Sequence, residues 1–504
     1  MPLHTKTIYA DIYSLVKKKK ITFKNTNNWP IEGDNFEKFY LNVISNFRGL
    51  ISKQKNPVDK LLEADVKYLM NLLEYLHYLI ALQLVKKNKN KEKNFDKILK
   101  KYKKNLFKSV QDHNRSQYNI FTKSKEILKN ILYSSSFENK VLVIGSRTQN
   151  LIDFMNLKKE SPIFAYADLI FSKNKKQFNI NKVDIIGIDL FLTNIQEYVK
   201  KNFRVKINLQ DLKKLLVNRI EQSNHKYLNI LNSNYIKQFS KIYFTDDARL
   251  EHRLLSTAAQ KLNIKTYKFD HGNNFYLKES ALTPFFLSNY SYHVCDNKIS
   301  YNFLTKLKKK NKNFPKTIII NAKINTLKKK IKKNISTKIN VIMLVGYPMT
   351  THRYISSEDL FWHQQFFMEL KILQTLKESG YKVLYQIHPG VKGWEHAFSE
   401  YVDEFIYEKF EKTWVKTDLL IFGHTATTTF GYALSTNIPI VLVDYKKEKK
   451  WSPGAFEYIK NRCSLVTFKN SNLISILDKN KFLKAVGKIG KVNKKFILNS
   501  NINF

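Results

Sequence analysis

Three short segments combine residue types that can move protons or hold anions, and each follows a run of apolar residues. The first is Asp270-His271-Gly272, directly after residues 266–269. A carboxylate and an imidazole there could serve as a general base pair, and the glycine would let the backbone approach a substrate closely. Because Asp, Gly and Asn are also the common turn formers, an ordinary turn remains the alternative interpretation.

The second segment is His388-Pro389-Gly390, which follows the strand predicted over residues 382–387. Proline has no amide hydrogen and a fixed φ, so it restricts the backbone beside the imidazole. A histidine can be protonated near neutral pH at modest cost. His388 is therefore a candidate donor to a phosphate or to a departing nucleotide oxygen.

The third segment runs from Gly423 to Gly431, between an apolar run and a predicted helix over residues 427–433. The hydroxyls of Thr425, Thr427 and Thr428 would meet the first backbone amides of that helix, which makes a candidate anion site. A threonine N-cap without a ligand is the alternative. Four hydroxyl residues in five positions are more than a cap requires.

Two further positions are weaker candidates for contact with a nucleotide. Gly346 and Tyr347 end the first predicted strand of the C-terminal part, and Arg353 follows in the predicted loop. Ordinary loop chemistry is the alternative for all three. No Asp-x-Asp follows a strand, since Asp246 and Asp247 are adjacent. We therefore expect a donor site without a metal, and no cofactor.

Two series of short apolar runs predict the elements that position these residues. Residues 1–135 have apolar side chains at helical spacing, which indicates a helical region. After residue 136, apolar runs alternate with longer amphipathic segments, which predicts a parallel sheet with helices on both faces. The first predicted strands are residues 141–144, 183–188, 242–244 and 266–269.

A lysine-rich stretch over residues 323–338 precedes the second series. Its predicted strands are residues 339–345, 382–387, 419–422 and 438–443, with a helix over residues 358–379. The predicted divisions of the chain are a helical region at 1–135, an α/β unit at 136–335, a second α/β unit at 336–475 and a tail at 476–504.

Composition limits the class of protein. The 504 residues include 87 Lys and Arg against 42 Asp and Glu, a net charge of +45, and 43% are hydrophobic, enough for real cores. The lysine runs lack the aromatic or arginine interleaving of a nucleic-acid groove, so we expect no nucleic-acid partner. Solvated surface, or attraction to an anionic membrane face or glycan, remains open.

Cysteine count and hydropathy limit the compartment. Two cysteines cannot make a disulfide framework or a four-thiolate zinc site. The longest apolar stretch, residues 66–85, contains five polar or charged residues, so it does not predict a membrane span. The first residues lack the features of a secretory signal. We expect a cytoplasmic protein, either free or at the inner face of the membrane.

Taken in this order, the three segments resemble a family pattern. An acid or histidine before glycine, then His-Pro, then a Ser/Thr cluster at a helix start is similar to bacterial polysialyltransferases and related sialyltransferases, and to CDP-glycerol glycerophosphotransferases. The resemblance covers residues 141–468 and is strongest over 382–444. It implies a GT-B fold, in which two Rossmann-like domains face a cleft, and cytidine-nucleotide donors used without a metal.

The resemblance also implies roles for individual residues. Asp270 or His271 matches the position that activates the acceptor, His388 the histidine on the donor phosphate, and Thr427 and Thr428 the hydroxyls on that phosphate. Sialyltransferases prefer two acids before the glycine and glycerophosphotransferases have His-Gly, so Asp-His-Gly is intermediate between them.

The implied function is a metal-independent glycosyltransferase that uses a CMP-activated sugar, sialic-acid-like or Kdo-like. It would build a cell-surface glycan such as a capsule or lipopolysaccharide, on a glycan or lipid-linked acceptor. Three alternatives remain: a CDP-glycerol-type glycerophosphotransferase, an isomerase of the UDP-sugar 2-epimerase kind, and a glycan binder without turnover.

Overall fold

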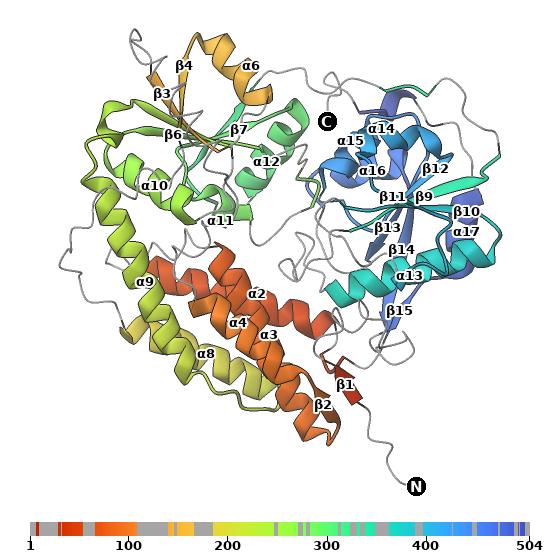
Figure 1. The fold of residues 1–504 in the computed structure, drawn as a ribbon, viewed down its shortest axis with the longest axis horizontal. Helices are drawn as coiled ribbons and strands as arrows, with labels where there is room; N and C mark the ends of the chain where they lie inside the picture. Colours follow the sequence, from red (N-terminus) through yellow and green to blue (C-terminus); the bar gives the residue numbers. More distant parts are fainter. Residues whose placement is uncertain are drawn as a thin grey trace.

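The computed structural model contains two α/β units and a layer of long helices (Figure 1). The residues that it describes are 7–9, 29–31, 33–53, 66–107, 140–145, 149–165, 185–245, 250–270, 276–278, 283–310, 314–322, 330–332, 338–347, 362–388, 397–425, 427–445, 451–471, 474–487, 492 and 494–498. The candidate residues His271, Arg353, Pro389 and Gly390 lie outside these ranges.

The first unit is built on a six-stranded parallel sheet of strand order β4-β3-β5-β6-β7-β8. Its strands are β3 (Lys140–Ile144), β4 (Ser161–Ala165), β5 (Lys241–Phe244), β6 (Lys265–Phe269), β7 (Tyr292–Cys295) and β8 (Ile318–Asn321). Its helices are α6 (Gln149–Lys158), α10 (Leu250–Lys261), α11 (Thr283–Leu287) and α12 (Lys298–Lys310). Buried apolar side chains cover both faces of the sheet, as a parallel sheet requires.

The second unit has the strand order β11-β10-β9-β12-β13-β14-β15, in which only β15 is antiparallel to its neighbour. Its strands are β9 (Val341–Val345), β10 (Lys382–Gln386), β11 (Glu404–Ile406), β12 (Leu419–Phe422), β13 (Ile440–Tyr445), β14 (Ser464–Ser471) and β15 (Ile474–Ile476). Its helices are α13 (Trp362–Glu378), α14 (Phe410–Thr413), α15 (Thr428–Leu434), α16 (Ala455–Arg462) and α17 (Lys479–Gly487). Counted along the chain, the first six strands have the 3-2-1-4-5-6 order of a Rossmann fold.

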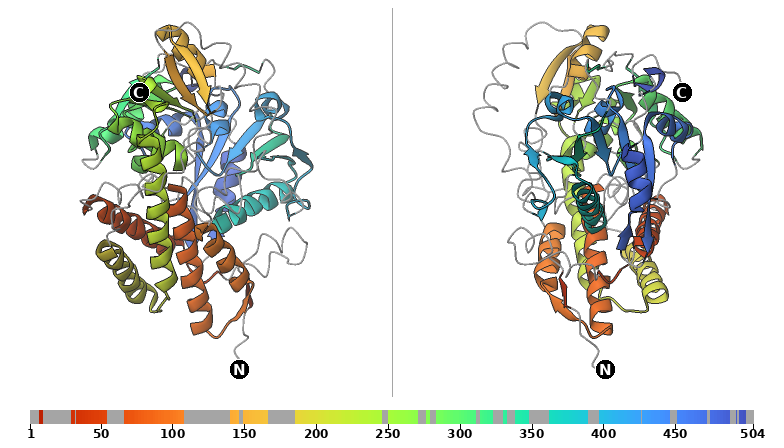
Figure 2. Two further views of the ribbon diagram at one scale, coloured as in Figure 1. Left: turned by 60° about the vertical axis from the view of Figure 1, so that its left-hand side comes forward. Right: turned by 90° about the vertical axis from the view of Figure 1, so that its right-hand side faces the viewer.

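The helical layer lies together at one end of the molecule in both sets of views (Figures 1 and 2). It contains α2 (Gly33–Lys53), α3 (Val66–Lys87), α4 (Phe95–Phe107), α8 (Ile185–Phe203) and α9 (Gln210–Leu231). A two-stranded parallel pair, β1 (Thr7–Tyr9) and β2 (Lys91–Lys93), lies beside it. Helices α8 and α9 pack on α2, α3 and α4, so part of the 136–335 stretch joins the N-terminal helices.

The predicted fold class is confirmed: two Rossmann-like α/β domains with an N-terminal helical region, the architecture of the GT-B class. The strand predicted at residues 183–188 is wrong, because its described part begins α8. Ile188, Phe191 and Ile195 recur there at helical spacing and are buried. Residues 479–487 of the predicted tail form α17, which packs on β14.

None of the described helices combines the length and apolar character that crossing a membrane would need. The longest apolar pattern, in α3, instead packs against the other helices of the layer.

Candidate functional site

The carboxyl ends of β9, β10 and β12 meet at the point where the strand order of the second sheet reverses. The Cα partners of Val345 are Gln386 in β10 and Phe422 in β12, so all three strands end at the same level. Open α/β sheets bind ligands at this point, outside the carboxyl ends of the strands. The residues that follow the three strands include the sequence candidates Gly346, Tyr347, His388 and Thr425.

Side chains of β10 and α13 pack closely against two glycines at these strand ends. A Cβ on Gly346 would overlap the hydroxyl of Tyr385. A Cβ on Gly423 would overlap the Cε of Met368 and lie 2.9 Å from the Nε2 of Gln365. The requirement for glycine at both positions is therefore one of space, set by side chains of β10 and α13.

Glu369, on α13, anchors the backbone that follows β9. Its Oε1 accepts from the Tyr347 N–H at 2.8 Å and from Gln365 Nε2 at 3.1 Å, and its Oε2 accepts from the Tyr385 hydroxyl at 2.7 Å. The side chain is fully buried. Burial raises the pKa of this carboxyl from 4.5 to about 7, although the three hydrogen bonds oppose the shift.

Sequence reasoning did not single out Glu369. The available signal was a glutamate and a glutamine four residues apart, Gln365 and Glu369, on a helix face that otherwise carries apolar residues such as Phe366 and Leu373. Polar residues at such a spacing share one helix face.

The threonine cluster divides into three environments. Thr427 is the N-cap of α15, and its side chain accepts from the Phe430 N–H at 3.2 Å, so the cap interpretation holds for this residue. Thr425 is buried, whereas Thr428 is exposed in the first turn.

His388 is half-buried, two residues beyond the end of β10. The backbone before it is fixed, since the Ile387 N–H donates to the Ile406 carbonyl at 2.9 Å. A second imidazole, His424, follows β12 and packs edge-on against the Tyr347 ring with 5.1 Å between centroids. His424 is buried, so the more accessible imidazole at this edge is His388.

In the first unit, Asp270 follows β6 and is buried. Its Oδ1 accepts from the Tyr276 hydroxyl at 2.7 Å and lies 3.0 Å from Nε2 of His293. His293 and Tyr276 were not identified from the sequence. The alternation of His293 and Cys295 in β7 places both side chains on one face of the strand, and this was the available signal.

The two units meet through the segment that carries Tyr276. Lys278 forms an ion pair with Asp444, at the carboxyl end of β13, and its Nζ lies 4.8 Å from the centroid of the Trp451 ring. Ser452 donates its N–H to the Leu277 carbonyl at 2.9 Å and its hydroxyl to the Tyr276 carbonyl. The segment after β6 is thus joined to the segment after β13, so these carboxyl edges approach each other at the interface.

No family model matches the chain, and the search of curated proteins returns no match. Among solved structures, the chain is similar to UDP-GlcNAc 2-epimerase from Methanocaldococcus jannaschii, in complex with UDP-GlcNAc and UDP, with a TM-score of 0.37, 12% identity, and coverage of 72% of this chain and 96% of that one. It is also similar to MurG from Acinetobacter baumannii, with a TM-score of 0.35, 10% identity, and coverage of 71% and 92%. For the glycosyltransferase SsfS6 from Streptomyces sp. SF2575, complexed with thymidine diphosphate, the TM-score is 0.27, the identity 10%, and the coverage 65% and 88%.

Proposed function

We propose that this chain is a glycosyltransferase that binds a nucleotide-activated sugar at the carboxyl edge of the second sheet. The observation that carries the proposal is the level ending of β9, β10 and β12 at the reversal of strand order. Side chains of β10 and α13 pack closely against the glycines at two of these ends, and Glu369 fixes the backbone after β9.

The proposed donor is a CMP-activated sugar, sialic-acid-like or Kdo-like, used without a metal. The acceptor hydroxyl gives its proton to a base as its oxygen bonds to the anomeric carbon. The bond from that carbon to the phosphate oxygen breaks, and CMP leaves with the electron pair. His388 and the hydroxyls of Thr425 and Thr428 stabilise the charge that develops on the phosphate. Pro389, Gly390, Gly346, Tyr347 and Arg353 complete the proposed donor site.

On the acceptor side we propose His271 as the base. Asp270, the other candidate, is buried and already engaged by Tyr276 and His293, which favours a supporting role for its carboxylate. The acceptor is a glycan or lipid-linked glycan destined for the cell surface. The net charge of +45 suits work at an anionic inner membrane face by an otherwise cytoplasmic protein.

Thermal shift with four nucleotides tests the donor assignment. Ligands that bind only the folded chain raise its unfolding temperature by mass action. We expect stabilisation by CMP and CDP that persists in EDTA, and a smaller effect of UDP and GDP. Stabilisation by UDP or GDP alone would remove the cytidine assignment.

Turnover separates the remaining alternatives. A glycosyltransferase releases CMP from a CMP-sugar at a rate that depends on an added acceptor. A glycerophosphotransferase releases CMP from CDP-glycerol instead, and an epimerase of the UDP-sugar kind interconverts its substrate with no acceptor present. A glycan binder turns over none of these donors.

A further inference from the structure

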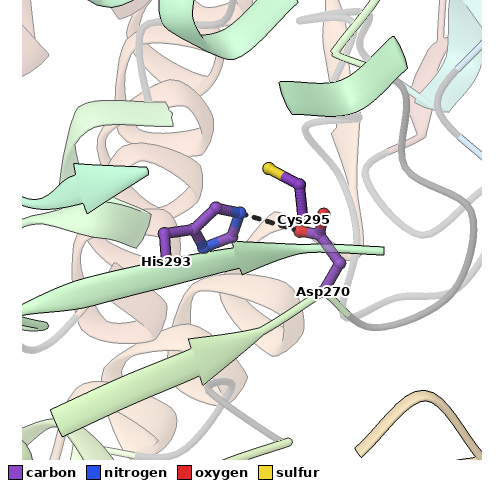
Figure 3. Close-up of side chains that lie close together, drawn as sticks. All are labelled: Asp270, His293 and Cys295. Carbon is purple, nitrogen blue, oxygen red and sulfur yellow. Dashed lines mark ion pairs between the residues drawn. The ribbon is translucent and has the colours of Figure 1, made fainter. Parts of the chain in front are cut away.

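Three side chains that can bind a metal lie close together near the carboxyl ends of two inner strands of the first sheet (Figure 3). His293 and Cys295 lie on one face of β7, and Asp270 follows the neighbouring strand β6. Because Phe269 is the Cα partner of Val294, Asp270 comes level with Cys295. The Asp270 N–H donates to the Val294 carbonyl at 3.3 Å, which fixes the carboxylate beside the two β7 side chains.

The geometry of the three is compact and shielded from water. One ligand atom from each lies within 4.8 Å of the others, and the residues are 4%, 0% and 0% exposed for Asp270, His293 and Cys295. The Tyr276 hydroxyl adds a fourth oxygen, 2.7 Å from Asp270 Oδ1 and 3.0 Å from His293 Nε2.

The hydrogen bonds among the described residues leave one carboxylate oxygen of the cluster without a partner. Asp270 Oδ2 is buried and has no hydrogen-bond partner in the described part of the chain. A buried polar atom without a partner costs free energy, and a bound cation removes that cost for a carboxylate oxygen. The cluster therefore has the ligand types of a cation site and a buried carboxylate oxygen that a cation would stabilise.

The donor chemistry selects the class of cation. One carboxylate oxygen, one imidazole nitrogen and one thiol sulfur form a mixed set that suits Zn²⁺, whereas Ca²⁺ and Mg²⁺ prefer oxygen ligands alone. Burial, with the negative charges of Asp270 and Asp296, raises the pKa of the Cys295 thiol well above 9.0. A bound cation has the opposite effect and favours the thiolate.

We propose that Asp270, His293 and Cys295 hold one Zn²⁺ ion, with the Tyr276 oxygen beside the fourth position. On binding, the Cys295 S–H bond breaks, the sulfur bonds to zinc and one proton passes to solvent. Asp270 and His293 give up their mutual contact: one oxygen of the Asp270 carboxyl donates a lone pair to the ion, and so does the His293 ring nitrogen that does not carry the ring proton. This site lies in the first unit and is separate from the proposed donor site, which needs no metal.

The bound ion would stabilise the interface between the two units. Tyr276 contacts the cluster through its hydroxyl, while its carbonyl accepts from Ser452 of the second unit. The next residues, Leu277 and Lys278, bond to Ser452 and Asp444. Zinc at the cluster would therefore stabilise the segment through which the units are joined.

Metal analysis of the full-length chain tests the proposal. After production with added zinc and extensive dialysis against metal-free buffer, we expect about one zinc ion per chain by mass spectrometry. Replacement by Co²⁺ should give the near-ultraviolet charge-transfer band of a thiolate ligand. A chain that holds neither zinc nor cobalt in stoichiometric amount overturns the proposal and leaves the cluster as a hydrogen-bonded network.

The second cysteine supplies a matched control. Cys463 is also buried, with a pKa raised to about 12, and is remote in sequence from the cluster. Cys295→Ser should lose the cobalt band, and zinc affinity in competition with a chromophoric chelator should fall by about 10²-fold or more, whereas Cys463→Ser keeps both. Equal losses in the two variants contradict the assignment. If Cys295→Ser does not fold, His293→Gln in the same competition decides the matter.

Discussion

Tyr347, the second residue after β9, donates its backbone N–H to Glu369 Oε1 over 2.8 Å, and the same carboxyl accepts from the Tyr385 hydroxyl in β10. One buried side chain of α13 therefore ties together the two strand ends that border the proposed nucleotide site. The same contact makes the stability of this edge depend on pH.

Glu369→Gln should change the pH dependence of stability. In the unfolded chain the carboxyl titrates near 4.5 and in the folded chain near 7, so between these values the folded chain binds more protons. The Glu369 carboxyl contributes on the order of 3 kcal/mol to the free energy of unfolding. This contribution is fully present below about pH 4.5 and is lost as the pH rises to about 7. Urea unfolding from about pH 5 to pH 8 should show that the free energy of unfolding of the variant rises relative to that of the wild type as the pH rises.

Glu378→Gln, on the same helix, is the control for that experiment. Glu378 is exposed and the ion pair with Lys479 lowers its pKa, so its effect has the opposite sign and is small. Parallel curves for Glu369→Gln and wild type across this range would show that the buried carboxyl does not titrate as argued.

Gly346→Ala should destabilise the chain by about 1–3 kcal/mol and weaken nucleotide binding, since the added Cβ would overlap the buried Tyr385 side chain. Gly49→Ala is the matched control. Gly49 lies within α2, and a Cβ there meets no atom within 4 Å, so alanine should stabilise by about 0.5–1 kcal/mol. Chemical unfolding of both variants measures the two changes in the free energy of unfolding, which should have opposite signs. Two changes of the same sign would contradict the argument that Tyr385 excludes a Cβ at Gly346.

Lys278→Met should cost about 3–5 kcal/mol, because it leaves the Asp444 carboxylate buried without its ion pair. The double variant Lys278→Met with Asp444→Leu should recover much of that loss. For comparison, Lys213→Met removes the partner of Asp189 in an ion pair whose side chains are 40% and 50% exposed, and should cost less than about 1 kcal/mol. A double variant no better than Lys278→Met alone would show that the pair is not coupled.

The strands were predictable where an apolar run is short and bounded by turn residues. Residues 242–244 and 419–422 are strands as predicted, and the strand predicted over 339–345 is formed by residues 341–345. The centre of a parallel sheet buries both faces and favours apolar side chains. The apolar run at 183–188 was predicted as a strand, but its described part begins a helix, because a buried helix can begin with the same composition as a strand.

The partners of the candidate residues were not predictable in this way. Glu369 and His293 belong to segments distant along the chain from Tyr347 and Asp270, and only the packing of α13 and β7 brings each pair together. The sequence shows which residue types follow each strand, whereas their orientation depends on contacts between elements.

His388→Ala should lower turnover by about 10²–10⁴, the range for loss of one positioned proton donor or charge stabiliser, while the fold survives. Rates of CMP release and the unfolding temperature measure the two effects. His225→Ala in α9 is the matched substitution in the helical layer, and should leave the rate unchanged. A folded His388→Ala enzyme with wild-type kinetics would place this histidine outside the mechanism.

The last prediction concerns the base on the acceptor side. His271→Ala should abolish transfer while nucleotide binding stays intact, because the acceptor hydroxyl then has no group to take its proton. Asp270→Asn should lose less activity, since the asparagine Oδ1 can still accept from the Tyr276 hydroxyl, 2.7 Å away in the wild type. Transfer assays and nucleotide titrations on both variants separate chemistry from binding. If Asp270→Asn is inactive although it is folded and keeps the metal content of the wild type, and His271→Ala is active, the carboxylate is the base in spite of its burial. The pattern of two acids before glycine, typical of sialyltransferases, would then be the closer guide to the mechanism than the His-Gly of the glycerophosphotransferases.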